Sequence, residues 1–154
     1  MLAELLAPRR IELCADVSSK KKALETLARL FAQSDPNLDQ DEIFNALTAR
    51  EKIGSTALEK GIAIPHCRIA GCQQPIAAVL TLKAGVDFDA RDNTAVDIIW
   101  ALIVPEQSDA DHLQILASLA GVLSDDENCL SIRNCKDNHQ LIDQLTHYEQ
   151  VLAS

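Results

Sequence analysis

The sequence predicts an α/β fold in which a mixed β-sheet is flanked by helices in a single-domain sandwich. Amphipathic helical patterns precede a β-rich middle section, and further helical patterns follow it. The chain has 154 residues, within the roughly 100 to 200 typical of one domain. Because no repeat, low-complexity tract or Gly/Ser-rich linker divides it, we expect one domain over residues 1–154.

The first helix is predicted after a pair of serines. Ser18 or Ser19 can cap it, because a serine hydroxyl accepts a hydrogen bond from a free backbone N–H of the first turn. Apolar residues then recur at the spacing of one helix face: Ala23, Leu24, Leu27, Leu30 and Phe31. Pro36 ends the helix.

A second helix is predicted from Asp39 and Asp41 to a point just before Gly54. Its apolar residues are Ile43, Phe44 and Leu47. Arg50 falls in its last turn.

The middle of the chain predicts three strands. They are Ile62 to Ile64, Ile76 to Leu82 and Val96 to Val104, with Gly, Pro, Asp and Asn between them. The last two runs are continuously apolar, which is typical of strands covered by helices on both faces.

Helices are predicted again near the C-terminus. Ser108 or Asp109 can cap one whose apolar residues are Leu113, Leu116, Leu119, Ala120 and Leu123. A shorter segment follows near Leu130 and Ile132. Asp137 opens a last helix with Leu141, Ile142, Leu145 and Tyr148.

Composition excludes several classes of function. Fourteen Lys and Arg against twenty-three Asp and Glu give a net charge of −9, so the chain repels nucleic-acid backbones and anionic lipid and suits a basic partner. The longest apolar run, Ile98 to Val104, is far shorter than the roughly 20 residues that span a bilayer. We expect neither nucleic-acid binding nor membrane insertion.

Five cysteines, an odd number without C-x-x-C spacing, argue against a disulfide framework or a zinc ribbon. Reduced thiols and the absence of a visible secretion signal predict a cytoplasmic protein. We interpret Cys67 and Cys72 as inert thiols.

The segment Gly54 to His66, GSTALEKGIAIPH, is the strongest functional signal. Pro65 keeps Ile64 out of the helical region, so the strand is predicted to stop and to leave His66 at its tip, held yet open. Position alone favours a loop histidine without a task, but a neutral imidazole is a good nucleophile and leaving group near pH 7.

This segment resembles the active-site signature of IIA domains of the fructose/mannitol type in the bacterial phosphotransferase system. The likeness continues through VDFDARDN, VDIIWALIVP and Asp111-His112-Leu113, from about Ile11 to Tyr148. It is strongest toward the nitrogen-regulatory members, because Arg-Glu-Lys precedes the Gly-Ser-Thr and Ile-Ala-Ile-Pro-His follows it. One departure is Cys67, where the family commonly has glycine.

The resemblance implies that His66 is phosphorylated and that His112 and Arg50 support it. Both fit physically, because the first turn of a helix favours an anion and an arginine fork matches phosphate oxygens. Spacing alone would make His112 a surface residue and Arg50 a complement to the helix end. Ser55 and Thr56 can either donate further hydrogen bonds or simply stop the helix.

The sequence therefore predicts a phosphotransferase that works as a regulatory phosphocarrier. The resemblance implies a small HPr-type phosphohistidine protein as donor, and targets in nitrogen metabolism, potassium transport or stress signalling, such as potassium-transport or sensor-kinase components. It implies no cofactor and no metal. We expect Ile62, Ile64 and Leu113 to frame the docking patch for the donor.

Three alternatives remain open. The chain can be the IIA component of a fructose/mannitol-type sugar permease that passes phosphoryl to a IIB domain, although no fused IIB or membrane segment is visible. It can be a pure interaction module whose histidine is never modified. It can also be a cysteine or metal hydrolase using Cys67 and His112.

Overall fold

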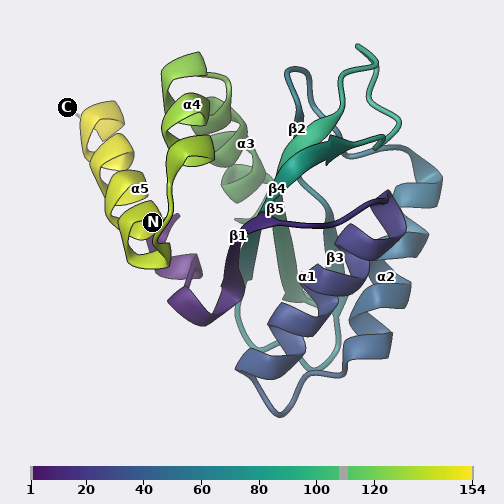
Figure 1. Ribbon diagram of the computed structural model, residues 1–154. Coiled ribbons are helices and arrows are strands. Elements are labelled where there is room, and N and C mark those ends of the chain that lie inside the picture. The colour runs from purple at the N-terminus through teal and green to yellow at the C-terminus, as the bar shows by residue number, and fades with distance from the viewer. Residues whose placement is uncertain (1, 108–110, 154) are drawn as a thin grey trace.

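The computed structural model describes residues 2–107 and 111–153, and it has the predicted α/β architecture (Figure 1). The strands are β1 (Ile11–Ala15), β2 (Ile62–Ala63), β3 (His66–Ile69), β4 (Ile76–Val86) and β5 (Val96–Pro105). The helices are α1 (Lys20–Ser34), α2 (Gln40–Ile53), α3 (Asp111–Leu123), α4 (Asp126–Asn134) and α5 (Asn138–Ala153). Two short 3₁₀ helices precede β1, η1 (Ala3–Leu5) and η2 (Pro8–Arg10).

The sheet is mixed, as predicted. β4 and β5 form an antiparallel pair at its centre, β1 lies parallel to β4, and both β2 and β3 lie parallel to β5. β4 and β5 are long and apolar along most of their length because both of their faces are covered. β1 and β3 were not predicted.

Strands β2 and β3 form one interrupted edge along β5. Ile62 is paired with Ile98 and His66 with Leu102, so the offset between partners is the same on both sides of the break. The carbonyl of Pro65 also accepts a hydrogen bond from the Leu102 N–H, at 2.9 Å. The proline therefore interrupts the strand without turning the chain away from the sheet.

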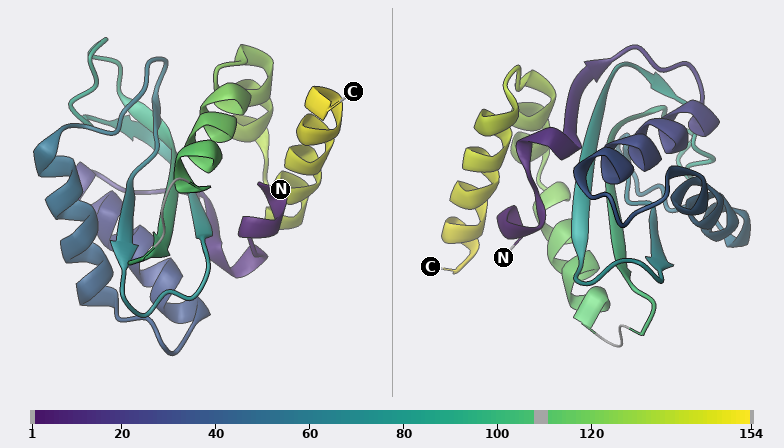
Figure 2. Two further views of the ribbon diagram at one scale, coloured as in Figure 1. Left: turned by 180° about the vertical axis from the view of Figure 1, so that it is seen from behind. Right: turned by 90° about the horizontal axis from the view of Figure 1, so that it is seen from below.

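Helices cover both faces of the sheet. α1 and α2 pack on one face, and α3, α4, α5 and the N-terminal 3₁₀ segment pack on the other (Figures 1 and 2). The first core contains Leu27, Phe31, Ile43, Leu47, Leu80 and Ile99, among others. The second contains Val79, Ile98, Trp100, Leu102, Leu119, Leu141 and Leu145, among others. The alternating side chains of β4 and β5 thus divide between two aliphatic cores.

Most of the predicted helix starts are confirmed by their caps. Ser19 Oγ accepts from the Lys22 N–H at 3.1 Å, and Asp39 accepts from the Glu42 N–H at 2.9 Å. Asp137 accepts from the His139 N–H at 2.7 Å at the start of α5. The predicted cap of α3, Ser108 or Asp109, lies outside the described residues.

A tight hairpin precedes the site and covers the outer edge of β2. The Leu58 N–H donates to the Ile62 carbonyl at 2.7 Å, and the Ile64 N–H donates to the Thr56 carbonyl at 3.1 Å. The turn uses left-handed backbone at Lys60 (φ 69°) and Gly61 (φ 85°), a conformation that glycine adopts without steric cost. Beyond the hairpin, β3 is left as an open edge beside α2.

Candidate active site

His66 begins strand β3, so the prediction that it sits at the tip of a terminated strand is wrong. The pairing with β5 resumes directly after Pro65, and the backbone of His66 is held against Leu102. Because successive side chains of a strand alternate, Arg68 projects to the same face as His66. The side chain of His66 is half-buried, held and open as expected.

One hydrogen bond orients the His66 ring. Its Nδ1 lies 2.8 Å from the backbone carbonyl oxygen of Ile64. A carbonyl oxygen can only accept, so Nδ1 carries the proton in the neutral ring and Nε2 keeps its lone pair. The ring therefore presents a nucleophilic nitrogen on the side away from the bond.

The structure brings together all three predicted site residues. His66, Arg50 and His112 line one surface pocket of about 470 Å³. Arg50 comes from the last turn of α2, and His112 from the first turn of α3. The pocket lies at the open edge of the sheet, where a helix of one layer ends and a helix of the other begins.

The electrostatic environment keeps His66 neutral. Burial lowers the pKa of His66, the bond to the Ile64 carbonyl raises it, and the positive charge of Arg50 lowers it further. The net result is a pKa below the ordinary value of about 6.5. The unprotonated, nucleophilic form of the ring therefore dominates at neutral pH.

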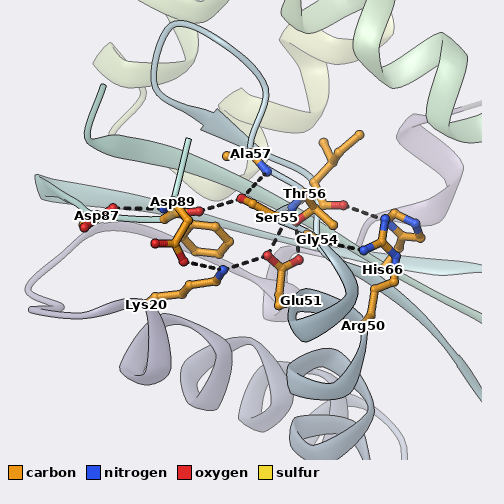
Figure 3. A network of polar contacts seen from close by, with 12 residues as sticks. Lys20, Arg50, Glu51, Gly54, Ser55, Thr56, Ala57, His66, Asp87 and Asp89 are labelled. Carbon is orange, nitrogen blue, oxygen red and sulfur yellow. Dashed lines mark hydrogen bonds and ion pairs between the residues drawn. The ribbon is translucent and has the colours of Figure 1, made fainter. Parts of the chain in front are cut away.

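Arg50 bonds to the end of its helix and also lines the pocket. Its guanidinium donates to the Gly54 carbonyl at 2.8 Å, so it does complement the end of α2. The same side chain lines the pocket beside His66 (Figure 3). The bond from one nitrogen to Gly54 restricts the orientation of the planar guanidinium.

Two pocket features were not predicted. Arg68 also lines the pocket, and continuing the alternation of the edge strand past Pro65 would have found it. Ile53, at the end of α2, is 84% exposed and lines the same pocket.

The predicted docking patch needs a correction. Ile62 and Ile64 are only 2% and 8% exposed and belong to the core, because their side chains point under α3 rather than outward. Leu113 is 61% exposed, as expected. The apolar surface beside the site is therefore formed by Ile53 and Leu113.

The Gly-Ser-Thr segment has structural bonds. Ser55 donates to the Phe88 carbonyl at 2.6 Å, and the Thr56 hydroxyl donates to the buried carboxylate of Glu51. Glu51 also accepts from the Thr56 N–H at 3.1 Å and pairs with Lys20 at 3.0 Å (Figure 3). Neither hydroxyl is directed at His66. Glu51 and Lys20 were not singled out in the sequence.

Cys67 fits the strand despite the departure from the family pattern. Its backbone is extended within β3, a conformation that any residue accepts. Burial raises the pKa of Cys67 to about 12, so its sulfur is a thiol rather than a reactive thiolate at neutral pH. This argues against a cysteine nucleophile. His139 and His147 are exposed on α5, as expected.

Within residues 2–107 and 111–153, no group of three or more His, Cys, Asp or Glu side chains has the arrangement of a metal site. In the same residues, no helix has the length and apolar character that crossing a membrane requires.

Comparison with known sequences places these observations in a family. Residues 4–148 match the family model of the phosphoenolpyruvate-dependent sugar phosphotransferase system, EIIA 2. The nitrogen regulatory protein of Pseudomonas aeruginosa is 48% identical over 122 residues, 79% of each chain. That of Escherichia coli K12 is 35% identical over 132 residues, 85% of this chain and 80% of the relative.

Solved structures of IIA proteins resemble this fold. The nitrogen regulatory protein IIA-Ntr of Neisseria meningitidis superimposes with a TM-score of 0.86 at 36% identity, covering 93% of this chain and 97% of that one. The mannitol IIA structure from Escherichia coli superimposes with a TM-score of 0.73 over 93% and 97% of the two chains, and at 17% identity this shows the shared fold alone. The chain therefore belongs to the EIIA type 2 family of the phosphoenolpyruvate-dependent sugar phosphotransferase system, within its nitrogen-regulatory IIA branch.

Proposed function

We propose that the protein is a regulatory phosphocarrier that accepts a phosphoryl group on Nε2 of His66. The observation that carries this proposal is the bond from Nδ1 to the Ile64 carbonyl, which leaves the Nε2 lone pair available in a pocket shared with Arg50 and His112. The donor is the phosphohistidine of a small HPr-type protein, the partner that the family resemblance implies.

The transfer balances without a cofactor. The lone pair of Nε2 attacks the phosphorus of the donor, a new N–P bond forms, and the donor N–P bond breaks as its electron pair returns to the donor ring. Because Nε2 carries no proton in the neutral ring, no proton has to leave. Such a transfer has a loose transition state, so alignment and charge stabilisation supply most of the catalysis.

The pocket offers groups for both tasks. Arg50 can present a planar pair of donors to the equatorial oxygens. His112 stands in the first turn of α3, where backbone N–H groups and the positive end of the helix dipole favour an anion. Phosphorylation adds roughly −2 charge to this surface, which is enough to change partner binding without a change of fold.

The regulatory assignment draws on the relatives named nitrogen regulatory proteins. Candidate targets are regulators of nitrogen metabolism, potassium transport or stress signalling, including sensor-kinase components. We expect these partners and the donor to meet the protein in the cytoplasm.

The deciding experiment is donor-dependent labelling of the wild type and of His66→Ala. The wild type should gain the mass of one phosphoryl group, acid-labile as expected for an N–P bond, and His66→Ala should not. His139→Ala is the matched control, because it removes an exposed histidine on α5 and should be labelled like the wild type. Absence of label on the wild type, or undiminished label on His66→Ala, would contradict the proposal.

A second arm separates regulation from sugar transport. Phosphorylated protein is mixed with a purified IIB domain of the fructose/mannitol type and its sugar, and sugar phosphate is measured. Regulation predicts that the label stays on His66. Efficient formation of sugar phosphate would instead make the protein a permease component.

A further inference from the structure

A buried carboxylate lies behind the reactive histidine on the protein side of the site. The side chain of Glu51 is only 4% exposed, although glutamate is rarely buried. It sits one residue after Arg50 on α2 but points the other way, into the protein under the Gly-Ser-Thr segment (Figure 3). The phosphoryl transfer proposed above assigns it no task.

Three donors satisfy this carboxylate. Oε1 accepts from the Thr56 N–H at 3.1 Å and pairs with Lys20 Nζ at 3.0 Å, and Oε2 accepts from the Thr56 hydroxyl. Thr56 is thus held by two bonds from one side chain. Lys20 is held in turn by Asp89 at 3.4 Å and by the face of the Phe88 ring, 4.7 Å from the ring centroid.

The network continues through the backbone to His66. The Thr56 carbonyl accepts from the Ile64 N–H at 3.1 Å, and the Ile64 carbonyl accepts from Nδ1 of His66 at 2.8 Å. The route from Glu51 to the imidazole therefore alternates hydrogen bonds with the covalent backbone of Thr56 and of Ile64. Because each of these bonds restrains the backbone group that follows it, the position of Thr56 bears on the position of the Ile64 carbonyl.

We propose that Glu51 is a positioning residue for His66: by anchoring Thr56 it holds the Ile64 carbonyl where that oxygen fixes the ring proton on Nδ1. This inference rests on the proposed function for its kinetic consequence, because only the form with a lone pair on Nε2 can accept phosphoryl there.

The Nδ1-protonated form of His66 has to be imposed by the protein. A free histidine side chain carries its proton mainly on Nε2, the form that is unreactive at that nitrogen. The site therefore depends on a bond at Nδ1 to impose the less common form. That bond comes from a backbone carbonyl at a proline-interrupted point of an edge strand, where β2 and β3 do not pair continuously. The bonds from the buried Glu51 to Thr56 hold the neighbouring hairpin strand and so compensate for the break between β2 and β3.

The experiment uses two variants of the network and two readouts. Glu51→Gln keeps the volume of the side chain but places an amide NH₂ where one acceptor oxygen was, so it loses a partner of Thr56 or of Lys20. Thr56→Val removes only the hydroxyl, and Thr56→Ser restores it. The first readout is the ¹⁵N NMR signals of the His66 ring in unphosphorylated protein, which report the tautomer. The second is the single-turnover kinetics of phosphoryl acceptance over a range of concentrations of an HPr-type donor.

We expect Glu51→Gln and Thr56→Val to move the His66 signals toward the Nε2-protonated form. Their rate constant for transfer at saturating donor should fall by about tenfold to a hundredfold, the loss expected from a displaced reacting group. The donor concentration that gives half of the maximal rate should change little. Thr56→Ser should restore both. Ser55→Ala is the matched control, because it deletes a hydroxyl of the same segment that bonds to Phe88 instead.

Wild-type ring signals and a wild-type transfer rate constant in folded Glu51→Gln and Thr56→Val would overturn the proposal, as would an effect confined to the donor concentration that gives half of the maximal rate. If Glu51→Gln does not fold, Thr56→Val decides by the same readouts. If the wild type accepts no phosphoryl group, the proposed function fails, but the tautomer measurement still decides whether Glu51 positions the ring.

Discussion

The proposed reactivity of His66 rests on the setting of its ring, which is half-buried and hydrogen-bonded through Nδ1 to the backbone carbonyl of Ile64. Burial, partly offset by that carbonyl and reinforced by Arg50, lowers the pKa of the imidazole. A lowered pKa means that the folded protein resists protonation at Nε2 more than an unstructured peptide does. Both reactivity and stability then depend on pH in a defined direction.

We predict that phosphoryl acceptance stays constant as the pH falls through about 6.5, and declines only at the lowered pKa of His66. The unfolded chain takes up the ring proton first, so the contribution of His66 to stability is fully present above about pH 6.5 and is lost as the pH falls. An NMR titration of the ring alongside a pH–rate profile tests this. A midpoint at or above that of an unstructured histidine peptide would contradict it.

Arg50→Ala and His112→Ala are expected to slow acceptance by about 10²- to 10³-fold each, the usual cost of removing one group that stabilises developing charge. The unfolding free energy should change by no more than about 1 kcal/mol, since both side chains are partly exposed and Arg50 loses one bond to Gly54. Stopped-flow transfer and thermal melts measure the two effects. Arg29→Ala is the control, because it breaks a surface ion pair between Arg29 of α1 and Glu12 of β1. Unchanged rates in both site variants would remove their assigned roles.

Among the elements, α5 and the N-terminal 3₁₀ helix are joined by one carboxylate. Glu149 accepts from the backbone N–H groups of Leu2 and Ala3, each at 2.8 Å. Burial acts to raise the pKa of Glu149, but hydrogen bonds from the N-terminal segment outweigh it and leave the pKa below its ordinary value. Asn138, at the other end of α5, donates to the Pro8 and Ile11 carbonyls at 2.9 Å. The first and last segments of the described chain are thus held together.

Glu149→Gln should destabilise the protein by about 1 to 3 kcal/mol near neutral pH, because hydrogen bonds to a charged acceptor are lost. The difference is fully present above the unfolded pKa of about 4.3 and disappears as the pH falls through the lower folded pKa. Urea unfolding at several pH values measures it. Since α5 does not line the pocket, phosphoryl acceptance should not change. A destabilisation that persists at low pH would show that another contact is responsible.

At the scale of the whole molecule, the net charge bears on encounter with the proposed donor. A chain of net charge −9 attracts a basic face, and the exposed apolar residues Ile53 and Leu113 beside the pocket then supply short-range contact. Because this attraction acts over distance, it is screened by salt.

We therefore predict that the second-order rate constant for transfer from an HPr-type donor falls by at least about tenfold between low and physiological ionic strength. Transfer within the preformed complex should vary little with salt. Stopped-flow measurements over a range of donor concentrations separate the two steps. A second-order rate constant independent of salt would contradict electrostatic steering.

Much of the fold followed from local patterns. The boundaries of α1, α2 and α5 were predictable because serine and aspartate caps and helical periodicity are properties of neighbouring residues. The long apolar runs of β4 and β5 predicted a sheet covered on both faces. β1 and β3 were missed, because five and four residues of mixed polarity become strands only when β4 and β5 supply the partners.

For the site, too, some features were predictable from the sequence and others were not. Through a family signature, the amino-acid sequence by itself identified Arg50, His66 and His112 as a group. Only the tertiary structure decided that these three share one pocket, that Ile62 and Ile64 are buried, and that Glu51 lies behind His66. The reason is that a motif records which residues are near in the chain, whereas the hydrogen bond that orients an imidazole depends on how a sheet edge, a hairpin and two helix ends meet in space.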